Sequence, residues 1–106
     1  MPLPPALSPE QRQAALEKAA AARRQRAELK EKLKMGSLSF DELLEQAERD
    51  EVVGKMKVVV VLESLPGLGK VKARRLMEEL GVSESRRVQG LGRNQRESLL
   101  ERFNQR

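Results

Sequence analysis

The segment from Leu65 to Leu76 constrains the fold more than any other part of the chain. Its sequence is LPGLGKVKARRL, and Pro66 ends a preceding helix because the proline ring cannot continue one. Gly67 and Gly69 accept positive φ values, so the pair predicts a tight turn. A helix that begins after this turn directs unpaired N–H groups and the positive end of its dipole toward it. The segment therefore predicts two helices joined by a hairpin, with an anion site at the turn.

Cationic residues follow the turn, and on a basic chain the expected anion is a nucleic-acid phosphate. Ala73 is small enough to let two helices pack closely. The alternative is a plain helix–helix turn with solvated charges, since a Gly-x-Gly pair alone is weak evidence. With Arg75 as additional charge, the candidate contacts are Pro66, Gly67, Leu68, Gly69, Lys70, Lys72 and Arg74.

The composition favours packed helices in a single domain. Of 106 residues only Phe40 and Phe103 are aromatic, so the core must consist of Leu, Val, Ala and Met. Proteins that bind single strands stack bases on aromatic rings, and this chain has too few of them for that function.

The chain contains no Cys and no His. Their absence excludes disulfides, the usual zinc sites, and catalysis by a thiol or an imidazole. The only Asp residues, Asp41 and Asp50, lie in an acidic block, so we expect no metal, no cofactor and no enzymatic activity, although a lysine nucleophile stays open. No apolar run is long enough to span a bilayer and no secretory signal is visible, so we expect no membrane partner and a cytoplasmic location.

Two basic blocks flank the acidic one. Residues 64–106 carry ten Lys and Arg against five Glu, and residues 12–34 carry eight against three. Residues 35–63 carry seven acids against three cations. Blocks of one sign are often only solvated faces, but two separated basic blocks favour two contacts with a polyanion.

Three regions are expected along the chain. Residues 1–7 are Pro-rich and predict an extended arm. Residues 8–36 predict a long basic helix, because Ser8, Pro9 and Gln11 form a start signal and Gly36 an end signal. Residues 37–106 predict a small helical globule.

The long helix is expected to project beyond the globule and to offer a second phosphate contact. A narrow apolar stripe, Ala15, Ala22, Leu29 and Leu33, runs beside a stripe of cations at helical spacing. An ordinary solvated helix is the alternative. The candidates for the second contact are Arg12, Lys18, Arg23, Arg24 and Arg26.

Four further helices are predicted. Ser39 and Glu42 form a second capping box, so one helix is expected from there to about Asp50. The segment 52–65 contains four successive valines that favour a strand, but its apolar residues also repeat at helical spacing. Because no partner strand is visible, one helix is predicted. The last two are expected over about Gly69–Leu80 and Arg93–Phe103, the latter burying Leu99, Leu100 and Phe103.

A second Gly-x-Gly turn, similar to the first, precedes the last helix. The two arginines before it are expected to lie beside the first hairpin and to extend the same phosphate track. The residues after it add a cation and a hydrogen-bond donor. The candidates at this turn are Arg86, Arg87, Gly90, Gly92, Arg93 and Asn94.

Several strings together resemble the actinobacterial integration host factors, small nucleoid-associated proteins unrelated in fold to the two-chain enterobacterial factor of that name. The resemblance covers nearly the whole chain, with segment 46–53, Arg93 and Arg96 more variable. The strings are AALEKAAAARR at 14–24, GKMKV at 54–58, LPGLGKVKA at 65–73, SESRR at 83–87, GLG at 90–92 and NQ at 94–95.

This resemblance implies an all-helical fold in which residues 37–106 form a helix-two-turn-helix DNA-binding domain, similar to that of a ribosomal small-subunit head protein. It implies a monomer at the nucleoid that binds the phosphate backbone of duplex DNA with little sequence preference, bends or compacts it, and supports gene regulation and phage integrase on DNA. Because the same fold occurs on the ribosome, RNA binding is the alternative function.

Overall fold

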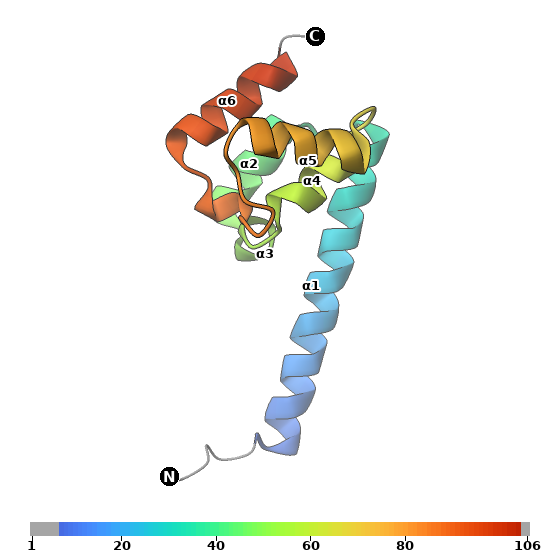
Figure 1. The fold of residues 1–106 in the computed structure, drawn as a ribbon. Coiled ribbons are helices and arrows are strands. Elements are labelled where there is room, and N and C mark those ends of the chain that lie inside the picture. Colours follow the sequence, from blue (N-terminus) through green and yellow to red (C-terminus); the bar gives the residue numbers. More distant parts are fainter. Residues whose placement is uncertain (1–6, 105–106) are drawn as a thin grey trace, which may run out of the picture.

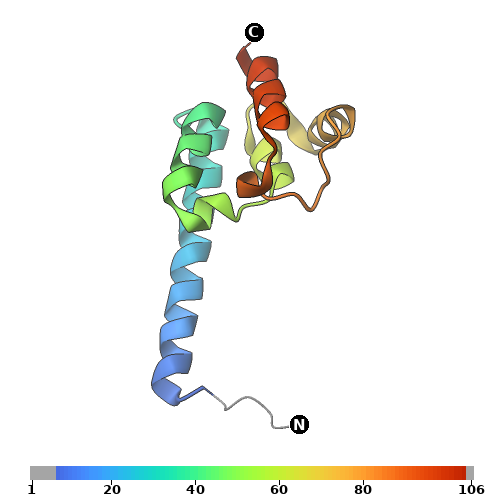
Figure 2. The same ribbon diagram turned by 90° about the vertical axis from the view of Figure 1, so that its left-hand side faces the viewer.

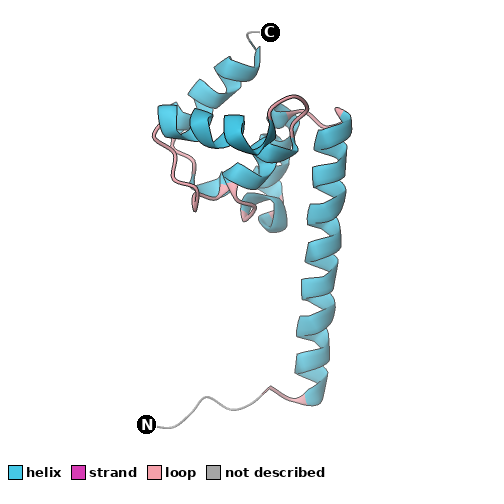
Figure 3. Ribbon diagram, turned by 45° about the vertical axis from the view of Figure 1, so that its right-hand side comes forward, coloured by secondary structure: helices cyan, strands magenta, loops and turns pink. Residues whose placement is uncertain are grey.

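The computed structural model describes residues 7–104, which form helices joined by short loops (Figures 1 and 3). This confirms the predicted all-α fold, with a long first helix and a small helical body. The predicted arm lies, apart from Leu7, outside the described residues. In chain order the elements are α1 Pro9–Met35, α2 Phe40–Arg49, α3 Glu51–Gly54, α4 Val58–Ser64, α5 Gly69–Glu79, the 3-10 helix η1 Val88–Gly90 and α6 Arg93–Asn104.

Both ends of α1 are capped as the sequence predicts. The Ser8 hydroxyl accepts a hydrogen bond from the Gln11 N–H at 3.1 Å, and the Gln11 side chain accepts one from the Ser8 N–H at 2.9 Å. Gly36 ends the helix with a φ of 78°. Only the second half of α1 packs on the body, through buried Leu29 and Leu33, while the first half projects away from it (Figure 2). Of the two alanines in the predicted apolar stripe, Ala15 is exposed and Ala22 is half-buried.

The body is organised around one aliphatic core. Phe40 packs edge-on against Phe103, with ring centroids 5.2 Å apart. The last helix was expected to bury three residues, but only Leu99 is buried, whereas Leu100 and Phe103 are half-buried because α6 lies at the edge of the body. The most completely buried side chains are Leu33, Leu43, Val53, Val58, Val61, Leu62, Met77 and Leu99.

The prediction of one continuous helix over residues 52–65 is wrong. The structure divides this stretch into α3 and α4, separated by Lys55, Met56 and Lys57. The Val58 N–H donates to the Arg86 carbonyl, and the Met56 carbonyl accepts from the Val88 N–H, each at 2.9 Å. These distant partners take the backbone groups that a continuous helix would use. The predicted helical core face survives in α4, where Val58, Val61, Leu62 and the following Leu65 are all buried.

Candidate nucleic-acid interface

The hairpin between α4 and α5 has the backbone that its glycines predict. Gly67 has a φ of 77° and Gly69 a φ of 74°, both in the left-handed region that favours glycine. A Cβ added at either position would meet nothing within 4 Å. The glycines are therefore required for backbone conformation, and the space around them is open to a ligand. Pro66, Gly67 and Gly69 are exposed and Leu68 is half-buried.

The beginning of α5, like that of α4, lacks the side-chain cap that α1, α2 and α3 possess. Ser8, Ser39 and Asp50 accept hydrogen bonds from the first turns of α1, α2 and α3, respectively. At α5 the N-cap residue is Leu68, which makes no side-chain cap. The N–H groups of the first turn, from Gly69 onward, are directed toward the hairpin, where an anion can accept from them.

The cations of α5 do not form one patch. Helical spacing places Lys70 and Arg74 on one flank of α5, and Lys72 and Arg75 on the other. Arg74 forms an ion pair with Glu84 at 3.0 Å. The predicted hairpin set is therefore divided between two surfaces, with the open hairpin between them.

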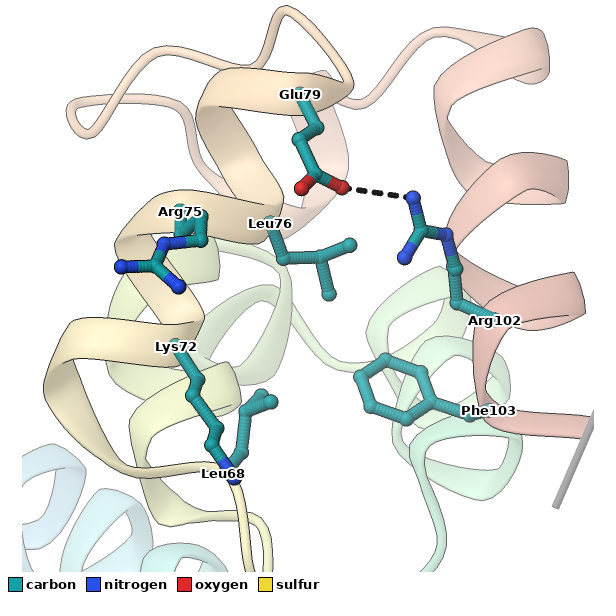
Figure 4. Close-up of a pocket in the computed structure, with 7 residues that line it drawn as sticks. All are labelled: Leu68, Lys72, Arg75, Leu76, Glu79, Arg102 and Phe103. Carbon is teal, nitrogen blue, oxygen red and sulfur yellow. Dashed lines mark hydrogen bonds and ion pairs between the residues drawn. The ribbon is translucent and has the colours of Figure 1, made fainter.

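A crevice of about 260 Å³ lies between α5 and α6 on the second flank (Figure 4). Lys72 and Arg75 come from α5, and Arg102 comes from α6, where its guanidinium donates to Glu79 at 2.7 Å. Sequence reasoning missed Arg102 because α5 and α6 are separate segments of the sequence and only the folded chain brings Arg102 close to α5. The remaining lining of the crevice is apolar and consists of Leu68, Leu76 and Phe103.

The expectation that Arg86 and Arg87 lie beside the first hairpin is wrong. Their backbone pairs with the beginning of α4, through the Arg86 carbonyl and an antiparallel bridge between Lys57 and Arg87. The hairpin follows the other end of α4, which is seven residues and about 10 Å long. The two arginines therefore lie near Lys57, and Arg86 bonds the Gly90 carbonyl at 3.1 Å.

The second Gly-x-Gly segment is not a second copy of the first turn. Among the described residues, the glycines with positive φ are Gly36, Gly67, Gly69 and Gly81, and neither Gly90 nor Gly92 belongs to that set. Gly90 ends η1, and an added Cβ there would come 3.3 Å from the Arg86 side chain. Its small size serves this close approach rather than a left-handed turn.

The residues that follow this segment are exposed at the beginning of α6. Arg93 approaches Glu97 at 3.7 Å, with 92% of its side chain exposed, and Asn94 is also exposed. The Gly92 N–H already donates to the Gln95 side chain at 3.1 Å. The beginning of α6 therefore offers mobile side chains but fewer free backbone donors than the beginning of α5.

A groove with five cations lies between α1 and the turn that joins α3 to α4. It encloses about 350 Å³. We call it the cationic groove, and its lining consists of Arg23, Arg26, Ala27, Lys30, Lys55, Met56, Lys57 and Val60.

Only two of the five predicted second-site residues, Arg23 and Arg26, line the cationic groove. Arg24 lies on another face of α1, and Arg12 lies on the projecting half. Lys18 does not line the groove, and its charge adds to the hydrogen bond and charge of Lys55, which lower the pKa of the Glu51 carboxyl.

Lys30, Lys55 and Lys57 were not assigned to any site from the sequence. Lys30 continues the cation spacing of α1, so this periodicity could have found it. Lys55 and Lys57 were hidden because they lie in the acidic block, whose acids are carried elsewhere on its surface.

No acidic side chain lines the cationic groove. Lys55 is paired with Glu51 at 2.8 Å, whereas Arg23, Arg26, Lys30 and Lys57 have no ion pair with any residue in the described range. Like charges held together raise the local potential and favour an anion.

Two other features of the described residues bear on chemistry. Within residues 7–104, no group of three or more acidic, Cys or His side chains is arranged to hold a metal ion. None of the helices in that range combines the length and the apolar composition needed to cross a bilayer.

Comparison with other proteins identifies related chains over nearly the full length. The model of the S13-like H2TH domain family matches residues 33–103. The integration host factor of Streptomyces coelicolor is 61% identical, covering 97% of this chain and 95% of the relative. That of Mycobacterium tuberculosis is 59% identical, covering 93% and 94%, respectively.

A solved structure has the same fold. It is described as sIHF bound to an 8bp palindromic DNA, and it superposes with a TM-score of 0.80 at 59% sequence identity. The match covers 82% of the present chain and 98% of the other.

Proposed function

This chain belongs to the actinobacterial integration host factor family, and from that premise we propose that it binds duplex DNA as an architectural protein of the nucleoid. The observation that carries the proposal is the open glycine hairpin at the uncapped beginning of α5. The role is structural rather than catalytic. It includes bending or compacting DNA and, through the shape of the DNA, supporting gene regulation and site-specific recombination such as phage integration.

At the hairpin, a phosphate oxygen accepts hydrogen bonds from the backbone N–H groups of Gly69 and Lys70, whereas the predicted Leu68 N–H donates to the Leu65 carbonyl at 3.4 Å. The positive end of the α5 dipole adds attraction. Lys70 and Lys72 approach the neighbouring phosphates from the two flanks of α5. Because phosphates are the same at every base pair, such contacts position the protein without reading sequence.

The cationic groove supplies a second DNA contact. It replaces the predicted set on α1 by Arg23 and Arg26 together with Lys30, Lys55 and Lys57. Arg86 and Arg87 lie near the same end of α4 as Lys57 and extend this second surface. Smooth bending of a 20–30 bp site by 40–90° costs on the order of 1–6 kcal/mol, which two separated contacts on one monomer can offset.

Duplex RNA is the second candidate, because the matching family model is that of an S13-like domain and the module occurs on the ribosome. Phosphates alone do not separate the two duplexes, since both carry them. The difference lies in groove shape and the 2′-hydroxyl of RNA.

The test is fluorescence anisotropy of a labelled random-sequence DNA duplex with unlabelled DNA or RNA duplexes of equal length as competitors. We expect DNA to compete at least tenfold better than RNA, with little dependence on DNA sequence. The slope of log K against log salt should show several phosphate contacts, at about 0.9 per contact. Equal or better competition by RNA would favour the ribosomal alternative, and a flat salt response would exclude both.

A further inference from the structure

The cationic groove has an apolar part that contact with a phosphate backbone does not require. Ala27, Met56 and Val60 share the lining with the five cations. Ala27 is exposed and Val60 is half-buried, so both offer apolar surface to a ligand, whereas Met56 is buried. A phosphate is hydrophilic and gains nothing from such a surface, whereas a planar base gains from covering it.

Both walls of the groove are fixed by the fold. The turn that carries Lys55 and Lys57 is held from behind, because Met56 and Val58 bond the backbone of the 86–88 segment. Gly54 packs so closely there that an added Cβ would come 3.1 Å from the Gln89 side chain. The backbone that carries these two lysines is therefore fixed, and a ligand does not pay the cost of ordering a loop.

The α1 wall is anchored independently. Leu29 and Leu33 are buried in the core on the same part of the helix. The Gln25 amide donates to Asp50 and ties α1 to the beginning of α3. The part of α1 that carries Arg23, Arg26 and Lys30 is therefore fixed relative to the turn.

The size and charge of the groove fit a small polyanion. Its volume of about 350 Å³ falls within the range of small-molecule sites. Four of its cations have no ion pair with another described residue. Neutralising them within this space requires a ligand with several closely spaced negative charges.

We propose that the cationic groove binds a nucleoside triphosphate. Its phosphates lie against Arg23, Arg26, Lys30 and Lys57, and its base covers Ala27 and Val60. The inference rests on the proposed function, because the same groove is the second DNA contact. A bound nucleotide occupies this contact and leaves the hairpin free, so it converts a protein that bridges or bends DNA into one that holds DNA at a single site.

Isothermal titration calorimetry of the full chain with ATP, tripolyphosphate and adenosine tests the proposal. We expect ATP to bind with one-to-one stoichiometry, tripolyphosphate to bind at least fivefold more weakly, and adenosine not to bind. Equal affinity of ATP and tripolyphosphate would overturn the nucleotide assignment, because the base would then contribute nothing. Absence of ATP binding would overturn it directly.

Charge reversal locates the site. The double variant Arg26→Glu, Lys57→Glu should lose ATP affinity at least tenfold, because both residues lie in the groove and are exposed or half-exposed. The control is Arg24→Glu, which reverses one charge on another face of α1 where the double variant reverses two, and its ATP affinity should stay within twofold of the parent. Equal losses in both variants would show that ATP responds only to net charge and would refute the site.

A variant of the apolar lining separates the base from the phosphates. Val60→Ser should lower ATP affinity while leaving tripolyphosphate affinity unchanged, with circular dichroism confirming the fold. Loss of affinity for both ligands in equal measure would contradict contact between the base and Val60.

A DNA-bridging assay distinguishes this inference from the proposed function. Saturating ATP should abolish DNA bridging in a pull-down of two labelled duplexes, yet leave single-duplex affinity within threefold. Failure of ATP to affect bridging removes the regulatory inference alone. A parent protein that shows no duplex DNA binding at all would instead remove the proposed function.

Discussion

In the proposed function the hairpin and the cationic groove hold a phosphate in two different ways. The hairpin would use backbone N–H groups whose direction is set by Gly67 and Gly69 within one short segment. The groove uses side chains from α1 and from the α3–α4 turn, which are about thirty residues apart in the chain. The first site therefore depends on backbone conformation and the second on charge. Substitutions that disturb one should leave the other largely intact.

The largest expected effect is on the hairpin. Gly69→Val forces a β-branched residue to a φ of 74°, which redirects the N–H groups of the first turn of α5. Loss of one or two charge-assisted hydrogen bonds should weaken duplex DNA binding by about ten- to a hundredfold. Anisotropy at fixed salt measures the loss, and Gly67→Val should behave alike.

The matched control is Gly81→Val. Gly81 also has a positive φ, 69°, but lies at the other end of α5. Both valine variants should lose a similar amount of stability, about 1–2 kcal/mol, by thermal unfolding. If Gly81→Val weakened DNA binding as much as Gly69→Val, strain rather than the hairpin geometry would explain the effect.

The next effect is on the groove. Arg26→Glu, Lys57→Glu should abolish DNA bridging and compaction, because an anion cannot approach two reversed charges. Affinity for a single short duplex, held by the hairpin, should fall less than fivefold. Single-molecule extension measures compaction, and Arg24→Glu is the control that should compact normally. A double variant that compacts DNA as the parent does would assign both functions to the hairpin.

A smaller effect is expected for the arginines near the beginning of α4. Each phosphate contact removed should reduce the salt slope of log K by about 0.9. Because Arg86 is partly engaged with the Gly90 carbonyl, Arg86→Ala, Arg87→Ala should lower the slope by about one to two units. A slope equal to that of the parent would leave both residues outside the DNA contact.

The smallest effect is expected from shortening the projecting helix. Deletion of residues 1–19 retains Arg23, Arg26 and the buried anchors Leu29 and Leu33. The groove should therefore persist, and compaction should remain within twofold of the full chain. Loss of compaction in this truncation would instead assign the second contact to the predicted candidates Arg12 and Lys18 on the projecting half of α1.

Much of the fold could be predicted because its signals are local. The capping boxes at Ser8 and Ser39 join residues three positions apart, so they can be recognised in the sequence and are confirmed in the structure. The helical core face from Val58 to Leu65 is a periodic pattern and is likewise confirmed. The candidate hairpin was equally accessible, since proline and glycine act on their own φ.

The sequence by itself determined where α1, α2, α5 and α6 begin, where the glycine hairpin turns and that aliphatic residues form the core. Tertiary structure alone decided that the helix predicted over residues 52–65 is interrupted around Met56, that Arg86 and Arg87 lie beside Lys57, and that five cations share one groove. The physical reason is the range of the interactions. Caps and turns are satisfied within a few residues, whereas the Met56 carbonyl and the Val58 N–H find their partners some thirty residues away, where only the assembled fold brings them.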